Sequence, residues 1–298
     1  MNHKSMLFTI GTALISLLSL PNVSFSGIIN NNANNLGIYI SGQYKPSVSV
    51  FSNFSVKETN FTTQQLVALK KDIDSVDIST NADSGINNPQ NFTIPYIPKF
   101  QDNAASFSGA LGFFYARGLR LEMEGSYEEF DVKNPGGYTK VKDAYRYFAL
   151  AREMQSGQTC PKHKETSGIQ PHGIYHTVMR NDGVSISSVI INGCYNFTLS
   201  NLPISPYMCV GMGIDAIQFF DSLHIKFAHQ SKLGITYPLS SNVHLFADSY
   251  YHKVIGNKFK NLRVQHVYEL QQVPKVTSAV ATLDIGYFGG EVGVRFIL

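Results

Sequence analysis

The chain has 298 residues, of which 43% are hydrophobic and only 15% are charged. Soluble domains usually carry about 25% charged residues, so the deficit indicates that part of the surface faces something other than water. The formal net charge of +3, without a basic stripe, does not favour nucleic acid as a partner.

The N-terminal segment is built like a secretory signal peptide. A short basic start precedes an apolar run over residues 6–20, and Ser24 and Ser26 provide small residues before a cleavage site. We therefore predict a signal peptide over residues 1–26 and an exported mature chain over residues 27–298. The apolar run is too short to span a membrane comfortably, which disfavours an N-terminal anchor.

Alternation of apolar and polar residues dominates the rest of the chain and predicts β-strands. In the clearest of them, residues 119–128, apolar side chains take one face and charged side chains take the other. The pattern predicts eight strands, over residues 36–44, 107–115, 119–128, 189–199, 208–215, 225–237, 243–252 and 277–298.

The connections between these strands differ greatly in length. Short turns rich in Gly, Pro, Asn and Ser occupy residues 117–118, 200–205 and 238–242, whereas residues 46–104 and 132–183 form very long loops. Short turns at one end and long loops at the other are typical of outer-membrane barrels.

Three segments leave details of the fold open. Residues 62–74 have the best helical pattern and predict a short helix. Residues 143–154 either raise the strand count to ten or twelve or extend over the rim. Before Gly289 and Gly290 the odd positions 281–287 are expected to face outward, and after them the even positions, so the glycines hold either a bulge or an additional turn.

Together these features predict an all-β fold, namely an antiparallel transmembrane β-barrel of eight strands with short periplasmic turns and long extracellular loops. In lipid every backbone polar group needs a partner within the protein, so the sheet must close on itself. A soluble exported β-protein shows the same alternation, but the leader, the low charge and the loop asymmetry favour the membrane. We expect the chain in the outer membrane, with its loops exposed at the cell surface.

Charged residues on the expected lumen face are the main candidate functional residues. They form either a salt-bridged plug or, in a wider barrel, the lining of an ion-selective pore. Eight strands leave an interior that side chains just fill, which favours the plug. The predicted lumen-lining charges are Arg120, Glu122, Glu124, Lys226, Lys232, Asp284, Glu291 and Arg295.

Two of the three cysteines are candidates for a cross-strand disulfide. Cys194 and Cys209 lie on neighbouring predicted strands, about equally far from the turn at 200–205, and both belong to the lumen face. Because disulfide geometry is strict, the alternative is two unpaired thiols that are off register by a residue or two. Cys160 is then left over and is able to pair between molecules.

No pattern in the chain predicts catalysis. There is no phosphate loop, nucleophile elbow or paired-histidine zinc motif, so we expect neither an enzyme nor a cofactor. Four residues of one loop offer zinc ligands, but their irregular spacing favours solvated side chains, and we predict no metal site. They are Cys160, His163, His172 and His176.

The last predicted strand resembles the signal that the outer-membrane assembly machinery reads. Phe296 and Leu298 lie on its apolar face, and that machinery is therefore an expected partner. The usual signal ends in an aromatic residue, whereas this chain ends in Leu298.

Several long stretches resemble one known family, the major surface antigens of Ehrlichia and Anaplasma. They are residues 23–26, 107–112, 215–221, 224–228, 232–235, 237–243, 246–248, 250–253 and 286–291. The resemblance covers most of the chain outside residues 46–104 and 155–180.

This resemblance implies an outer-membrane surface antigen of an obligate intracellular bacterium, in which the barrel anchors exposed, variable loops. It implies outer-membrane lipid as the surroundings and host surface molecules or antibodies as partners, and it leaves oligomers open. Some members are described as porins, so the alternative function is a porin that passes small solutes across the outer membrane.

Overall fold

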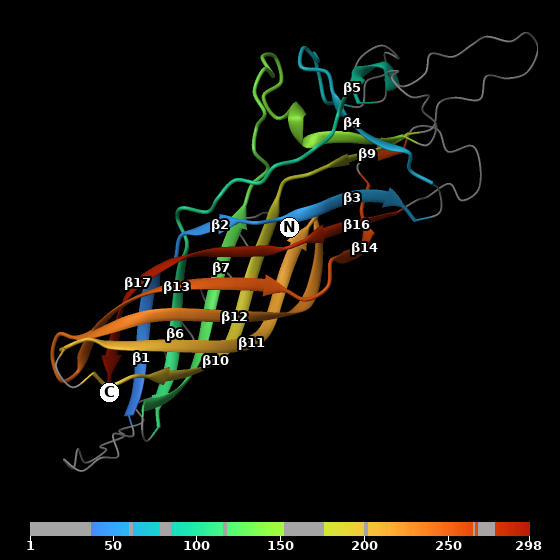
Figure 1. Cartoon of the computed structure of the whole chain (residues 1–298). Coiled ribbons are helices and arrows are strands. Elements are labelled where there is room, and N and C mark those ends of the chain that lie inside the picture. Colours follow the sequence, from blue (N-terminus) through green and yellow to red (C-terminus); the bar gives the residue numbers. More distant parts are fainter. Residues whose placement is uncertain are drawn as a thin grey trace, which may run out of the picture.

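The computed structural model describes residues 37–59, 62–77, 85–86, 88–115, 118–151, 176–199, 202–264, 266–267 and 278–298. Eight long antiparallel strands form a closed barrel, because the last strand pairs back to the first (Figure 1). In barrel order they are β1 (Gly37–Tyr44), β6 (Phe107–Phe114), β7 (Leu119–Phe130), β10 (Val184–Asn196), β11 (Ser205–Phe219), β12 (Ser222–Pro238), β13 (Val243–Val254) and β17 (Gly286–Ile297). The predicted eight-stranded transmembrane barrel is thus confirmed.

The barrel is strongly staggered. If directly paired residues are followed around the barrel from Ile40, the path reaches Gly286 at the start of β17. The Gly286 carbonyl accepts a hydrogen bond from the Val50 N–H, so one full circuit ends ten residues beyond Ile40 in the chain. In closed barrels such a stagger goes with a strand tilt of roughly 35–45°. Eight strands then enclose only enough space for side chains.

The outside of the barrel is an apolar band between two belts of aromatic side chains. Near the short turns the exposed aromatic residues are Phe113, Tyr115, Tyr195, Phe197, Tyr237 and Phe296. Towards the opposite end they are Tyr44, Phe107, Phe227, Tyr251 and Phe288. Aromatic belts of this kind mark the two membrane–water interfaces, so this face meets lipid. Among the described residues, no helix is long and apolar enough to cross a membrane.

The described parts of the long connections form two small sheets at the end of the barrel opposite the short turns (Figure 1). The five-stranded sheet contains β15 (His266–Val267), β9 (His176–Arg180), β8 (Tyr147–Ala151), β4 (Gln65–Leu69) and β5 (Phe92–Pro95). The three-stranded sheet contains β14 (Lys258–Leu262), β16 (Ala279–Asp284) and β3 (Ser52–Glu58), while β2 (Ser47–Ser49) pairs with β17. Two single 3-10 turns cover Pro89–Asn91 and Ala144–Arg146. We call these two small sheets, together with the described connections around them, the cap.

The helix predicted over residues 62–74 is wrong, because this segment contains the strand β4. Leu66 and Ala68 pack towards the barrel, whereas Val67 and Leu69 pack on the opposite side of the sheet. A strand buried on both faces has consecutive apolar residues and loses its alternation. Residues 147–151 form β8, which is likewise buried on both faces and pairs with β4 and β9. These residues therefore belong to the cap and not to the barrel.

Gly289 and Gly290 hold neither a bulge nor a turn. β17 pairs with β13 in one unbroken register, from Gly286 opposite Lys253 to Phe296 opposite Val243. The residues expected to face outward before the glycines are instead buried in the core, namely Ala281, Leu283, Ile285 and Tyr287. They are apolar because the upper end of the barrel is filled with apolar side chains.

The lipid face predicts a position-dependent cost of charge along β11. Val210→Arg places a cation on the central apolar band and should lower the free energy of unfolding from lipid by about 2–4 kcal/mol. Gln218→Arg, on the same face but near the extracellular end of β11, should change it by about 0–1 kcal/mol. Urea titrations in lipid vesicles, followed by circular dichroism, measure both. Equal costs for the two variants would contradict the assignment of the lipid face.

Candidate functional site

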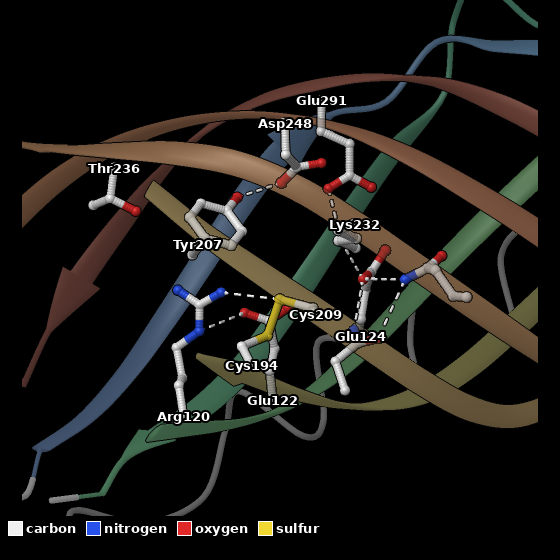
Figure 2. The surroundings of a disulfide bond; sticks show 12 residues. Arg120, Glu122, Glu124, Cys194, Tyr207, Cys209, Lys232, Thr236, Asp248 and Glu291 are labelled. Atoms are coloured by element: carbon white, nitrogen blue, oxygen red, sulfur yellow. Dashed lines mark hydrogen bonds and ion pairs between the residues drawn. A yellow bond between two sulfur atoms is a disulfide. The ribbon is translucent and has the colours of Figure 1, made fainter. Parts of the chain in front are cut away.

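Four oppositely charged side chains form a closed ring inside the barrel, which we call the charge ring. Lys45 Nζ lies 2.5 Å from Glu124 Oε1 and 3.0 Å from Glu291 Oε1. Lys232 Nζ lies 2.5 Å from Glu124 Oε2 and 2.7 Å from Glu291 Oε2 (Figure 2). Each cation therefore bridges both carboxylates. All four side chains are buried.

The charge ring is assembled from distant parts of the sequence. Glu124 comes from β7, Lys232 from β12 and Glu291 from β17, while Lys45 lies between β1 and β2. Neutral side chains complete the coordination of Glu124: the amides of Gln230 and Asn192 donate to its Oε2 at 3.0 and 3.2 Å. Burying charges in this way is tolerable only when each is paired and hydrogen-bonded.

A second group, which we call the lower layer, lies towards the short turns. Arg120 and Arg295 each place one nitrogen 3.9 Å from Glu122 Oε2, and the Tyr39 hydroxyl donates to the same oxygen at 2.6 Å. Aromatic rings cover both guanidinium groups. The carbon of the Arg120 guanidinium lies 4.7 Å from the centre of the Tyr207 ring, and that of Arg295 lies 4.8 Å from the Tyr39 ring.

A disulfide links β10 and β11 within the lower layer. Cys194 and Cys209 are directly opposite in the strand register, both face inward, and their sulfur atoms are bonded (Figure 2). One Arg120 nitrogen lies 3.4 Å from the sulfur of Cys209. Cys160 lies outside the described residues.

Above the charge ring lies a smaller polar group. The His252 ring contacts Asp215 Oδ2 at 2.9 Å and stacks on Tyr287 with ring centres 4.6 Å apart. Glu128 accepts hydrogen bonds from the hydroxyls of Ser47 and Ser106 at 2.8 and 2.9 Å. These groups are also buried, so the polar interior continues up to this level.

An apolar layer then fills the mouth of the barrel. Its barrel residues include Phe130, Val184, Ile186, Ile217, Phe219 and Ile285, and its cap residues include Tyr96, Phe148, Leu150 and Met179. Tyr96 and Phe148 stack nearly parallel, with ring centres 4.2 Å apart. The cap therefore sits on the barrel through one continuous core, and side chains close the lumen twice, once by paired charges and once by apolar packing.

An ion pair also ties the cap to the barrel. Arg146 donates through both terminal nitrogens to the two oxygens of Asp131, each at 3.1 Å. Burial favours a lower pKa for Arg146, but hydrogen bonds and charge attraction from Asp131 hold its pKa above the usual value. The guanidinium thus remains charged at the junction.

The structure brings together six of the eight predicted lumen charges, namely Arg120, Glu122, Glu124, Lys232, Glu291 and Arg295. The other two lie elsewhere. Lys226 is half-buried where β12 extends beyond β13, and it donates to the carbonyl of Lys258 at 3.0 Å. Asp284 lies on β16, outside the barrel wall, and accepts a hydrogen bond from Asn53. Its assignment to the lumen is wrong, because the odd positions of β16 face the core.

Lys45 is the main functional residue that the sequence pattern missed. It follows the predicted strand 36–44, and Pro46 next to it reads as the start of a loop. In fact β1 and β2 pair with β17 in one common register on either side of Lys45 and Pro46. Continuing the alternation from Gln43 through Pro46 would have placed Lys45 inside.

Two further predictions concern metal binding and assembly. Within the described part of the chain, no group of three or more His, Cys, Asp or Glu is arranged to hold a metal ion. Of the zinc-ligand candidates, His176 is buried at the start of β9, and Cys160, His163 and His172 lie outside the described residues. Phe296 and Leu298 are 47% and 73% exposed at the end of the barrel that carries the short turns.

A closed barrel with an apolar, aromatic-belted exterior and a buried polar interior defines an integral protein of the outer membrane, exposed at the cell surface. Comparison with known proteins gives the family. Residues 30–298 match the surface antigen family, and the chain belongs to it. Major surface antigen 4 of Anaplasma marginale is 25% identical over 289 residues, which cover 96% of this chain and 91% of that protein. The family resemblance seen in the sequence is thereby confirmed.

Solved barrel structures also align with this chain. The outer membrane protein OprG from Pseudomonas aeruginosa gives a TM-score of 0.45 at 11% identity, over 88% of this chain and 96% of that chain. Neisserial surface protein A gives a TM-score of 0.34 at 11% identity, with the same coverage of both chains.

Removing one member of the charge ring should be costly. Glu124→Gln leaves Lys45 and Lys232 with Glu291 as their one remaining carboxylate, and breaking a buried pair in this way typically costs about 3–5 kcal/mol. We expect the urea midpoint of unfolding to fall accordingly, as measured by circular dichroism in detergent micelles.

The matched control is Asp74→Asn, which breaks the exposed pair that Asp74 forms with Lys140 on the cap. Exposed pairs contribute little because water screens them. An unchanged midpoint for Glu124→Gln, or equal shifts in both variants, would contradict the role given to the charge ring.

Proposed function

We propose that this protein is a surface antigen whose sealed barrel anchors the cap in the outer membrane and presents it to the host. The observation that carries the proposal is the double closure of the lumen, by the charge ring and by the apolar layer beneath the cap. A barrel filled in this way serves as a rigid support. Host surface molecules or antibodies are the partners that this role implies, and the proposal includes no enzymatic activity.

The construction of the cap supports this role. The outer side of its five-stranded sheet has a second core, which contains Val67, Leu69, Phe92, Tyr138 and Tyr145. The cap therefore presents a folded surface. The name of the Anaplasma marginale relative, a major surface antigen, agrees with this proposal.

The proposal includes export and assembly of the chain. Residues 1–26 act as the signal peptide, and the outer-membrane assembly machinery recognises the last strand through Phe296 and Leu298. The exposure of both side chains on the lipid-facing side of the barrel supports this recognition.

The competing function is a porin, and conductance separates the two. The purified protein, added to planar lipid bilayers at high salt, should give no stepwise current, because both closures must open before ions pass. A known porin reconstituted in parallel shows that insertion is detected. Reproducible current steps whose frequency scales with the amount of protein would overturn the sealed-barrel proposal.

Presentation of the cap predicts a specific labelling pattern. In a Cys160→Ser background, Lys142→Cys places a thiol on the exposed cap and Ser240→Cys places one in a short turn. A membrane-impermeant maleimide should label the first variant on intact cells and the second only after lysis. Labelling of both on intact cells, or of the second alone, would refute the proposed orientation.

A further inference from the structure

The lower layer of the lumen holds more positive charge than its partners balance. Arg120 and Arg295 are only 2% and 1% exposed, and they share the single carboxylate of Glu122. The other acid nearby, Asp248, accepts a hydrogen bond from the Tyr207 hydroxyl, and among the described residues no ion pair joins it to either arginine. The described contacts thus set two guanidinium groups against one carboxylate.

Several donors of these two arginines have no hydrogen-bond acceptor among the described residues. They are Nε and Nη1 of Arg120 and Nε of Arg295. Arg120 donates one hydrogen bond, to the sulfur of Cys209, which is a weak acceptor. Arg295 donates to the Thr236 hydroxyl at 3.4 Å, which is a long contact.

The surrounding side chains do not supply the missing acceptors. The rings of Tyr39, Tyr207 and Phe246 cover the faces of the guanidinium groups, and both tyrosine hydroxyls donate to carboxylates. Aromatic faces stabilise a cation but accept no in-plane N–H hydrogen bond. The edges of both guanidinium groups therefore remain available.

Buried donors of a charged group are expensive to leave unpaired, and native proteins leave few of them so. We propose that the lower layer binds a small monovalent anion of the size of chloride or bromide, between the guanidinium groups of Arg120 and Arg295. The single negative charge of the anion, together with that of Glu122, balances the two arginines. The narrow, aromatic-lined interior selects a small ion over phosphate or a carboxylate ligand. This inference does not depend on the proposed antigen role.

The test uses bromide as the probe on the full mature chain in a neutral detergent. The melting temperature should rise saturably with sodium bromide but not with sodium gluconate at equal ionic strength, because ligand binding stabilises the folded state by mass action. Crystals grown in bromide should show an anomalous peak beside Arg120 and Arg295. Identical responses to both salts, with no such peak, would mean that water alone fills the site and would overturn the proposal.

Two substitutions should change the bromide dependence of the melting temperature in opposite directions. Glu122→Gln removes the competing carboxylate and should lower the half-saturating bromide concentration at least about ten-fold, since a 1.4 kcal/mol gain is ten-fold in affinity. Arg295→Met should abolish the bromide dependence.

The matched control is Lys226→Met, which removes a cation from the upper end of the barrel and should respond like the unmodified chain. Should Arg295→Met fail to fold, the gain in Glu122→Gln still decides the question. A half-saturating concentration in Glu122→Gln equal to or higher than that of the unmodified chain would refute the site.

Discussion

The requirement that buried charge be paired governs this structure. Lipid forces the sheet to close, and closure with a ten-residue stagger leaves a narrow interior into which every inward-facing polar side chain must fit. Lys45 and Lys232 can lie there only because Glu124 and Glu291 bridge them. The charge ring therefore connects strands that are not neighbours in the sheet, and it couples opposite walls of the barrel.

The interior changes character along the barrel axis. Around the charge ring the barrel has a polar interior and an apolar outer face, as expected of a membrane barrel. Above His252 and Asp215 it is apolar inside, like the core of a soluble protein, and residues such as Phe130 and Ile217 pack against the cap. The barrel wall therefore supplies part of the core on the inner side of the cap. The cap and the barrel share one hydrophobic core, which explains how the described parts of the long connections hold a defined shape at the cell surface.

This change of character also explains what the sequence predicts well and what it does not. The eight barrel strands follow from alternation, because each has lipid on one side and a polar lumen on the other. Alternation disappears in β4 and β8, where apolar cores lie on both faces, and these segments read as a helix and an ambiguous strand. In β16 the alternation persists, but its apolar face meets the core in place of lipid, so the segment reads as a lipid-facing strand. Lys45 was missed because Pro46 interrupts a strand whose register in fact continues, and pairing of the charges depends on contacts between strands that no local pattern contains.

The same division separates the cap residues that tolerate substitution from those that do not. Cap residues such as Phe148 and Leu150 are bound to the barrel core, so a change of volume there disturbs both cap and mouth. Exposed cap residues such as Asp74, Lys140 and Lys142 contact solvent or each other, and their replacement costs little. A barrel that holds the inner side of the cap constant therefore leaves the outer side free to change.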